Sequence, residues 1–360
     1  MGETYPSFTV AAVQAASVFF DRDKTIDKAI RCIEEAADKG AVIIGFPELF
    51  VSGHAGLWYM AKRTNPLPLQ GKLFKELVKN GVKLPSPEVD RLCAAARKAH
   101  AFVVIGMSEV DTLYPGTLYM SQLTISDKGE VMAMRRKLVV TAIEKLIYSN
   151  GDGSHLQVHD TPYGKLSALQ CGEHASSLSK YALLAMGAQV HVAGWPSFPR
   201  NVNGEGQSDS VQFRVRQFAH EGKLFILNSC GVTDQQNIDF CCDTQEEKDN
   251  IVSEGGGTAI IGPNGQYLAG PIYGGEAVLT AEISLEDALP GKMKHNVLGH
   301  YSRWDVLNLN FNREKLSPFG NMPVEKADPA CPSAELQETR TMLRDLNDKL
   351  DGLAENLRHK

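Results

Sequence analysis

The stretch Lys165-Leu-Ser-Ala-Leu-Gln-Cys-Gly-Glu173 joins a short strand to a potentially reactive side chain. Residues 165–170 have the length and the apolar content of a buried strand. Cys171 follows directly, so its thiol lies at the end of that strand. A cysteine in such a position is more often a core residue than a nucleophile, because a catalytic thiol needs a neighbouring base or cation. The rest of the chain offers both.

Two upstream stretches also place a charged residue at the end of a strand-like segment. They are Phe-Pro-Glu48-Leu and Arg-Arg-Lys137-Leu. Each residue has an ordinary interpretation, Glu48 as a helix cap or surface carboxylate and Lys137 as part of a solvated basic face. With Cys171, however, they supply a base, a cation and a sulfur nucleophile, which suits covalent chemistry on a carbon–nitrogen bond. We therefore predict that Glu48, Lys137 and Cys171 are catalytic.

Each predicted catalytic residue has a definite task. Glu48 would accept the thiol proton, and partial burial would raise its pKa toward the useful range. Lys137 would stabilise the negative charge of a tetrahedral adduct, a contribution of about 3–4 kcal/mol for comparable donors. Glu144 lies seven residues after Lys137. We predict that it orients Lys137 and the substrate or carries a proton.

Strands and helices alternate along most of the chain. Strands are expected over residues 8–15, 41–45, 102–106, 116–126, 131–138, 165–170, 189–193, 225–228, 257–262, 266–270 and 277–283. Helices are expected over residues 23–39, 87–100, 179–186 and 210–220, with Ser86 as an N-cap before Pro87. This alternation predicts an α/β fold. Two sheets packed face to face between helices, a four-layer α-β-β-α sandwich, suit the length.

Composition excludes several classes of partner. The chain has 360 residues, of which 43% are hydrophobic and 22% charged, and its net charge is −6. This charge argues against binding to nucleic acid or to an anionic membrane surface, and the apolar runs are too short to cross a bilayer. The first residues lack the pattern of a signal peptide. Seven cysteines without a Cys-x-x-Cys pair favour a reducing compartment and no zinc site. We expect a cytoplasmic protein.

The C-terminal stretch has a different pattern from the rest. Leu336, Leu343, Leu350 and Leu357 repeat every seven residues, which predicts an amphipathic helix about three heptads long. We therefore expect a main domain over residues 1–315 and a C-terminal extension over residues 316–360. The helix would pack on its own domain or join subunits into a homodimer, a larger homo-oligomer or a filament.

The motifs around the three catalytic candidates resemble those of the nitrilase superfamily of carbon–nitrogen hydrolases, and within it the nitrilase branch. The resemblance covers roughly residues 8–312, with its motifs in the expected order. The matching segments are Gly45-Phe-Pro-Glu48, Arg136-Lys-Leu138, Gly151-Asp-Gly-Ser154, Gln170-Cys-Gly-Glu173, Val192-Ala-Gly-Trp-Pro196, Gly257-Thr-Ala-Ile-Ile-Gly-Pro263 and Gly299-His-Tyr-Ser-Arg303. The Cys-x-Glu sequence and the later Trp-Pro pair are typical of the nitrilase branch.

The resemblance implies a four-layer fold with a Glu–Lys–Cys triad and no metal or organic cofactor. It implies that Cys171 attacks a small-molecule nitrile to give a thioimidate, and that water then releases ammonia and a carboxylic acid. Two alternatives stay open on the same scaffold. One is an enzyme that hydrolyses cyanide or hydrates a nitrile to the amide, and the other is a non-catalytic, filament-forming homologue.

We also predict residues that contact the substrate. Gly172 stands where nitrilases commonly have Trp, and it would either enlarge the pocket or allow a tight turn. The loops near residues 54–60, 114–121, 195–207 and 232–256 are expected to shape the pocket. The predicted substrate-binding residues are His54, Trp58, Tyr59, Gly172, Glu173, His174 and Trp195.

Overall fold

The computed structural model describes residues 4–54, 67–197, 207–249, 251 and 255–317. The chain divides into a unit of residues 1–314 and a unit of residues 315–360. Only residues 315–317 of the second unit are described, so the heptad helix lies outside the described residues and stays a prediction. None of the described helices is long and apolar enough to cross a membrane.

The first sheet is mixed and contains seven strands. Its order is β13 (Ala277–Ser284), β1 (Ser7–Gln14), β2 (Ala41–Gly45), β3 (Phe102–Val110), β4 (Leu118–Ile125) and β5 (Val131–Arg136), with β6 (Tyr148–Ser149) beside β4. Strands β1, β2 and β3 run parallel, while β13, β4 and β5 pair antiparallel to their neighbours. The two parallel pairs bring the ends of β1, β2 and β3 to one edge.

The second sheet has six strands and a parallel centre. Its order is β12 (Tyr267–Tyr273), β11 (Gly256–Ile261), β10 (Phe225–Cys230), β9 (Val190–Trp195), β8 (Gly164–Gln170) and β7 (Val158–Thr161). Strands β8, β9 and β10 are parallel, and the strands outside them pair antiparallel. The parallel centre again gathers several strand ends at one edge, where α/β proteins usually place their sites.

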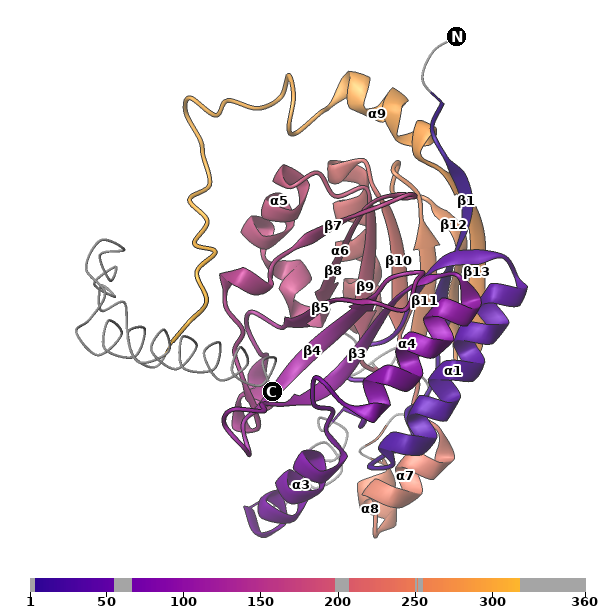
Figure 1. The fold of residues 1–360 in the computed structure, drawn as a ribbon, viewed down its shortest axis with the longest axis vertical. Coiled ribbons are helices and arrows are strands. Elements are labelled where there is room, and N and C mark those ends of the chain that lie inside the picture. Colours follow the sequence, from indigo (N-terminus) through magenta and orange to yellow (C-terminus); the bar gives the residue numbers. More distant parts are fainter. Residues whose placement is uncertain (1–3, 55–66, 198–206, 250, 252–254, 318–360) are drawn as a thin grey trace, which may run out of the picture. The chain divides into compact units, whose positions relative to one another are not determined.

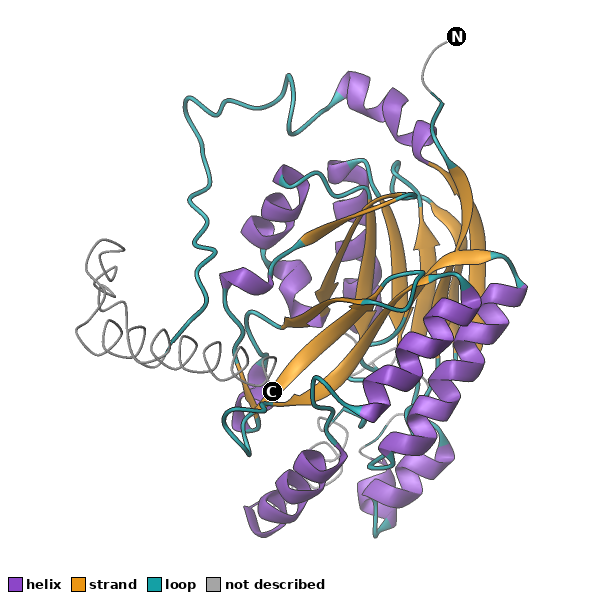
Figure 2. Ribbon diagram, viewed as in Figure 1, coloured by secondary structure: helices purple, strands orange, loops and turns teal. Residues whose placement is uncertain are grey.

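Helices cover the outer face of each sheet. On the first sheet, α1 (Arg22–Asp38) and α4 (Pro87–Ala99) pack against each other and against the apolar side chains of β1, β2 and β3. On the second sheet, α5 (Ser177–Ala185) and α6 (Gln207–Gly222) lie over β8 to β11. Figures 1 and 2 show these helix pairs on opposite sides of the strands.

The inner faces of the two sheets meet in a third core. It contains Phe8, Val10, Ala12, Ile43 and Val104 from the first sheet and Leu166, Val190, Val192, Phe225 and Leu227 from the second. The order of layers is therefore helix, sheet, sheet, helix, and the predicted four-layer α-β-β-α sandwich is confirmed.

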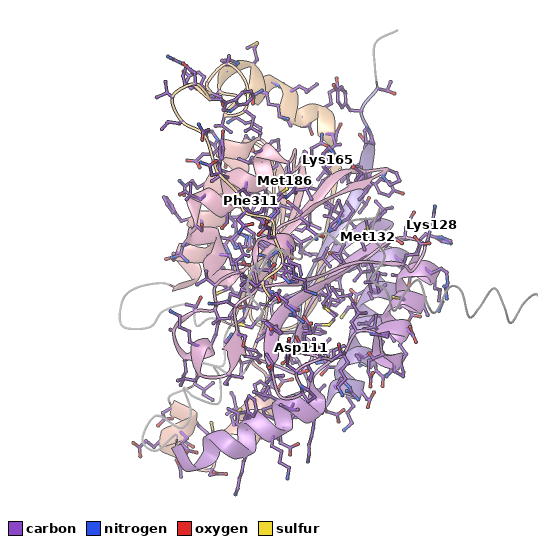
Figure 3. All side chains as sticks on the ribbon, turned by 60° about the vertical axis from the view of Figure 1, so that its left-hand side comes forward. Asp111, Lys128, Met132, Lys165, Met186 and Phe311 are labelled. Atoms are coloured by element: carbon purple, nitrogen blue, oxygen red, sulfur yellow. The ribbon has the colours of Figure 1, made fainter. Side chains whose placement is uncertain are left out.

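The C-terminal part of the first unit returns to the second sheet. Leu309 and Phe311 pack on the same apolar cluster as Met186, which follows α5. Figure 3 shows Phe311 beside Met186. The carbonyl of Asn312 comes so close to Gly153 that a Cβ there would lie 1.8 Å from the oxygen.

Helix boundaries follow local capping chemistry. The side chain of Asp21 accepts a hydrogen bond from Lys24 N at the start of α1, and that of Ser86 accepts one from Val89 N at the start of α4. Helix α4 ends at His100, which has the left-handed φ of 51° that commonly terminates helices. The Ser86 N-cap was predicted from the sequence.

One longer helix, α3 (Leu67–Asn80), and several short elements were not predicted. The short elements are α7 (Gln235–Cys241), α8 (Gln245–Asp249), α9 (Leu289–Lys294), β6, β7 and the 3-10 turns η1 (Ala142–Leu146), η2 (Gly153–His155), η3 (Cys171–Ala175) and η4 (Leu285–Ala288). The expectation of a loop over residues 232–256 is therefore wrong for α7 and α8. The side chain of Asp234 caps α7 by accepting a hydrogen bond from Asn237 N, a signal present in the sequence.

Candidate active site

Cys171 occupies a strained elbow between β8 and η3. Its φ of 43° is left-handed, a conformation that costs a non-glycine residue roughly 1–2 kcal/mol. Strain of this kind persists only where the surroundings hold the backbone in place. The side chain is 6% exposed, and it lines a cavity.

Glu48 reaches the same cavity from the first sheet. It follows β2, and its backbone N–H donates a hydrogen bond to the carbonyl of Trp195, at the end of β9, over 3.3 Å. Two glycines make room for this crossing. A Cβ on Gly106 would lie 2.4 Å from Pro47 O, and one on Gly194 would lie 3.2 Å from Glu48 N. The segment that carries Glu48 therefore joins the two sheets.

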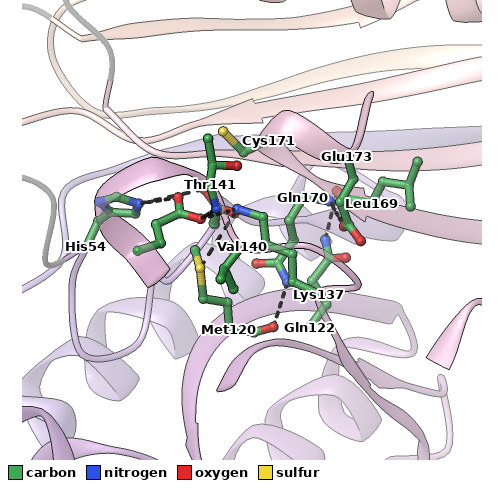
Figure 4. Close-up of polar contacts among 12 residues, drawn as sticks. His54, Met120, Gln122, Lys137, Val140, Thr141, Leu169, Gln170, Cys171 and Glu173 are labelled. Carbon is green, nitrogen blue, oxygen red and sulfur yellow. Dashed lines mark hydrogen bonds and ion pairs between the residues drawn. The ribbon is translucent and has the colours of Figure 1, made fainter. Parts of the chain in front are cut away.

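Lys137 links two carboxylates. It follows β5, its side chain is fully buried, and its Nζ donates to Glu48 Oε1 over 2.7 Å and to Glu144 Oε2 over 2.8 Å. Figure 4 shows Lys137 with Cys171 and Thr141 close by. The structure thus brings Glu48, Lys137, Glu144 and Cys171 together from four separate elements.

Glu144 is fixed by the turn that carries it. It lies in η1, and its Oε2 accepts a hydrogen bond from Thr141 N over 2.6 Å. Its Oε1 lies 3.3 Å from His54 Nε2, which is also 3.9 Å from Glu48 Oε2. Glu144 therefore holds Lys137 from one side and contacts His54 on the other.

Burial and charge push the pKa values of these groups apart. Burial raises the pKa of Glu48 to about 7, although Lys137 opposes the shift. Burial raises the pKa of Glu144 as well, but hydrogen bonds and charges from His54 and Lys137 outweigh it and leave the pKa below its ordinary value. Burial would lower the pKa of Lys137, yet Glu48, Cys171 and Glu144 together raise it. Burial and the charge of Glu48 hold the pKa of Cys171 well above 9.0.

These shifts define the protonation state near neutral pH. Cys171 is a thiol, Lys137 an ammonium ion and Glu144 a carboxylate, while Glu48 titrates in the working range. Glu48 Oε1 accepts from Lys137, whereas Glu48 Oε2 has no hydrogen-bond partner among the described residues. A buried carboxylate oxygen that accepts no hydrogen bond is costly. It can accept a proton from a thiol that lines the same cavity.

The cavity has a volume of about 310 Å³. Glu48, His54, Glu144 and Cys171 line it on the polar side. Its other described walls are mostly apolar, with five further polar side chains. They are formed by Ala15, Ser17, Phe19, Pro47, Phe50, Thr141, Ala142, Ile143, Pro196, Ser197, Gly231, Val232, Thr233 and Asn237. Such a pocket suits a small, largely uncharged organic molecule.

The predicted substrate-binding residues have different positions. His54 lines the cavity, and Trp58 and Tyr59 lie outside the described residues. Gly172, Glu173, His174 and Trp195 are not among the described lining residues, and the last three are buried. The structure therefore places Glu173, His174 and Trp195 in the interior behind the described cavity wall, whereas Gly172 is half-buried.

Gly172 is explained by a close contact. Its φ is not left-handed, and a Cβ at this position would lie 2.7 Å from Thr141 Oγ1. The strained turn is taken by Cys171 itself. Neither sequence alternative for Gly172 describes this arrangement, in which the glycine lets η1 and η3 approach each other.

Glu173 ties the cysteine turn to the lysine strand. Its carboxylate accepts hydrogen bonds from Arg135 Nη2 over 2.5 Å, from Leu138 N over 2.8 Å and from Gln170 N over 2.9 Å. Arg135 was missed as a functional candidate. Arg135 stands two residues before Lys137. Because side chains alternate along a strand, this spacing points both to the same face, and it was the available signal.

Three side chains here have the geometry of potential metal ligands. Ligand atoms of Glu48, His54 and Glu144 lie within 4.8 Å of one another. However, the ammonium group of Lys137 already bridges the two carboxylates. A cation would meet that positive charge, so the donor set fits an internal ion pair better than a metal centre.

Comparison with known proteins gives consistent matches. The family model described as carbon–nitrogen hydrolase matches residues 9–291. An aliphatic nitrilase from Rhodococcus rhodochrous is 40% identical, with 88% of this chain and 86% of that protein covered. Nitrilase 1 from Arabidopsis thaliana is 36% identical, with 90% and 93% covered.

Solved structures show the same fold. A carbon–nitrogen hydrolase from Helicobacter pylori G27 superimposes with a TM-score of 0.63 at 19% identity, covering 80% of this chain and 93% of that one. An amidase from Nesterenkonia sp. AN1 superimposes with a TM-score of 0.58 at 18% identity, covering 79% and 95%. At these identities the likeness concerns the fold alone.

Proposed function

The chain belongs to the carbon–nitrogen hydrolase family, in its nitrilase branch, and we propose that it hydrolyses an organic nitrile through a covalent bond to Cys171. The products are a carboxylic acid and ammonia. The observation that carries the role of Cys171 is the Glu48 carboxylate. One of its oxygens accepts a hydrogen bond from Lys137, and the other has no hydrogen-bond partner among the described residues, in a cavity that Cys171 also lines.

The first step forms the carbon–sulfur bond. Glu48 takes the proton of the Cys171 thiol while the sulfur attacks the nitrile carbon, and the nitrile nitrogen takes up a proton. The product is a thioimidate, in which carbon is singly bonded to sulfur and doubly bonded to NH. Lys137 lies beside the attacking group and stabilises negative charge as it develops.

Two water molecules complete the reaction. The first adds to the thioimidate carbon, and the tetrahedral adduct loses ammonia to leave a thioester on Cys171. The second hydrolyses the thioester, which releases the carboxylic acid and restores the thiol. Glu48 removes a proton from each water in turn. The sum is one nitrile and two waters to one acid and one ammonia.

The cavity supports an organic nitrile rather than cyanide as the substrate. Its volume and its apolar walls, which include Phe19, Phe50 and Val232, exceed what a molecule as small as hydrogen cyanide occupies. An amide product would require that the tetrahedral adduct break its carbon–sulfur bond before ammonia leaves.

A product screen tests the activity. Ammonia, acid and amide are measured for aliphatic, aryl, arylacetic and cyanide substrates. We expect acid and ammonia in equal amounts from at least one organic nitrile. Amide accumulating without acid, or turnover of cyanide alone, would contradict the proposed reaction.

The Cys171→Ala variant tests the nucleophile. We expect it to lose ammonia release completely while it keeps the secondary structure of the wild type by circular dichroism. Mass spectrometry of the wild type stopped in acid during turnover should find the substrate fragment on the peptide that contains Cys171. Retained turnover in the variant would exclude Cys171 as the nucleophile.

We also propose that the protein forms a homo-oligomer and that it is located in the cytoplasm. Large apolar side chains are exposed on and beside the helices of the second sheet, namely Leu178, Phe213, Tyr301, Trp304 and Leu307, and such patches commonly mark contacts between proteins. Cys32, Cys93, Cys171 and Cys230 are thiols, which supports a reducing compartment. Sedimentation velocity tests the first proposal, and cell fractionation tests the second.

A further inference from the structure

His174 is a fully buried histidine that the proposed reaction does not use. It lies in η3, three residues after the nucleophile, and it is absent from the described cavity wall. Its Nδ1 is 2.9 Å from the carbonyl oxygen of Cys171. A carbonyl oxygen can only accept a hydrogen bond, so His174 Nδ1 must carry the proton.

The hydrogen bonds continue into the second sheet. His174 Nε2 lies 3.1 Å from His191 Nε2, and His191 Nδ1 lies 2.8 Å from Ser167 Oγ. Because Nδ1 of neutral His174 carries the proton, its Nε2 is an acceptor. His191 therefore donates from Nε2 and accepts from Ser167 at Nδ1. This arrangement of protons satisfies all three hydrogen bonds, from Ser167 on β8 to His191 on β9, from His191 to His174, and from His174 to the carbonyl of Cys171.

Burial keeps both imidazoles neutral. It lowers the pKa of His174 to about 4, and it lowers the pKa of His191 well below its ordinary value. The rings are also fixed by packing. His174 stacks on Trp195 at a centroid distance of 4.9 Å, and His191 meets Phe218 edge-on at 5.0 Å. The series is therefore rigid as well as uncharged.

The carbonyl that receives this bond belongs to the strained residue. Cys171 has a φ of 43°, and such a conformation persists only when neighbouring contacts determine it. Glu173 holds the residue before Cys171, because its carboxylate accepts a hydrogen bond from Gln170 N. His174 holds the peptide after it. The elbow is thus restrained on both sides.

We propose that His174 is a positioning residue for the nucleophile, which it holds in the left-handed elbow through its Nδ1–H, while His191 and Ser167 fix its tautomer. The inference rests on the proposed role of Cys171 in nitrile hydrolysis. A shift of about 1 Å in a reacting atom can lower a rate by about 100-fold, so the bond acts on the chemical step rather than on binding.

Three variants separate positioning from packing. His174→Phe keeps a ring against Trp195 but removes the donor, and His174→Asn retains a donor near the place of Nδ1. His191→Phe is the matched control, because it makes the same substitution in the neighbouring buried ring and leaves the bond to Cys171 in place. Circular dichroism and thermal melting establish that each variant is folded at the assay temperature.

We expect His174→Phe to lower kcat about 10- to 100-fold with KM changed less than about threefold. His174→Asn should restore kcat to within about threefold of the wild type, and His191→Phe should lose less than His174→Phe. Equal losses in the two Phe variants would show a packing role and overturn the proposal. So would a fully active His174→Phe, or a His174→Asn no better than His174→Phe.

Two measurements do not depend on nitrile turnover. The rate at which iodoacetamide alkylates Cys171, read by peptide mass spectrometry, should fall in His174→Phe and recover in His174→Asn. In wild-type protein labelled with ¹⁵N-histidine, NMR should find the proton of His174 on Nδ1 and that of His191 on Nε2. A proton on His174 Nε2 overturns the proposal, even if the variants fail to fold. A wild type without nitrilase activity would instead overturn the proposed function.

Discussion

Lys137 lies between two carboxylates, Glu48 and Glu144, whose pKa values are shifted in opposite directions. Glu48 is more deeply buried and its pKa lies near 7, whereas Glu144 is further stabilised by His54 and Thr141 N and its pKa is low. Two titratable groups with pKa values pushed apart are suited to different tasks. Glu48 fits a base that takes up and gives back a proton, and Glu144 fits a permanent anion that orients Lys137.

The pH dependence of the reaction should report on this arrangement. Because Glu48 must be deprotonated to accept the thiol proton, we expect kcat/KM to rise with pH through about 7. The negative charge of Glu144 raises the pKa of Glu48. Glu144→Gln should therefore move this rise to lower pH while it lowers kcat, since Lys137 loses one partner. Initial rates across a pH series measure both effects, and a rise that moves to higher pH would contradict them.

The sequence indicated the reacting residues better than the residues that support them. Glu48, Lys137 and Cys171 are each a residue type with obvious chemistry at a strand end, and Glu144 follows Lys137 by seven residues. The structure brings all four together. Glu173 and His174 are equally reactive types in the same motif, yet they face the interior. Sequence spacing does not show which side of a five-residue turn faces the cavity.

At the scale of elements, the approach of η1 to η3 depends on a missing side chain. A Cβ on Gly172 would lie 2.7 Å from Thr141 Oγ1 and at least 3.9 Å from the other atoms of that side chain. We expect Gly172→Ala to destabilise the protein by about 1–3 kcal/mol and to lower kcat, because the overlap displaces the turn that carries Cys171.

The double variant Thr141→Ala/Gly172→Ala provides the control. Thr141→Ala removes the hydroxyl that the new methyl group would meet, so part of the lost stability should return. Denaturant unfolding of the wild type, both single variants and the double variant gives the coupling free energy. A coupling near zero would show that another contact requires the glycine.

The ion pair between Glu173 and Arg135 joins β5 to η3. Removing one partner of a buried pair typically costs about 3–5 kcal/mol, because it leaves an uncompensated charge, and we expect a loss of this size for Glu173→Gln. Glu34→Gln, which removes an exposed partner of Lys98, is the control and should lose almost nothing. Denaturant unfolding at neutral pH measures both, and equal losses would contradict the structural role of Glu173.

The same variant has a pH signature. Contacts with Arg135 and two backbone N–H groups outweigh burial and lower the pKa of Glu173 below its ordinary 4.5. A group with a lowered pKa contributes stability above its unfolded value, and that stability is lost as pH falls through the folded value. The difference in the free energy of unfolding between the wild type and Glu173→Gln should therefore become smaller below pH 4.5.

Several elements with a strong periodic pattern were predicted closely, but the long helix α3 and the shortest elements were missed. The strand at β2 was predicted over its whole length, and the N-cap of α4 at its true residue. Helix α3 carries Leu73 and Leu77 at helical spacing, a signal that was present but not used. Helices of five to seven residues, such as α7 and α8, complete too few turns for a periodic pattern.

For the whole molecule, the site exists only when the two sheets are packed together. Glu48 and Lys137 belong to the first sheet, and Cys171 belongs to the second. Alternation of strands and helices predicted the layers, but it does not set the register of one sheet on the other. That register depends on side chains that interlock across the middle of the sandwich.

Gly45 is the point where this packing can be tested. It ends β2, three residues before Glu48, and a Cβ there would lie 2.8 Å from Val192 Cγ1 on β9 and 3.0 Å from Ser229 Oγ on β10. We expect Gly45→Ala to push the sheets apart beneath the site. The cost should be about 1–3 kcal/mol of stability, with a fall in kcat, because Glu48 then moves relative to Cys171.

The same substitution elsewhere shows whether the sheet contact is the cause. Gly71 lies in α3 with no atom within 4 Å of an added Cβ, so Gly71→Ala should preserve kcat and stabilise the helix by up to about 1 kcal/mol. Val192→Ala removes the closest clashing methyl group, so it should recover part of the kcat lost in Gly45→Ala. Kinetics and denaturant unfolding of these variants compare the two outcomes. If Gly45→Ala kept full activity, the spacing of the sheets at this point would not control the distance between Glu48 and Cys171.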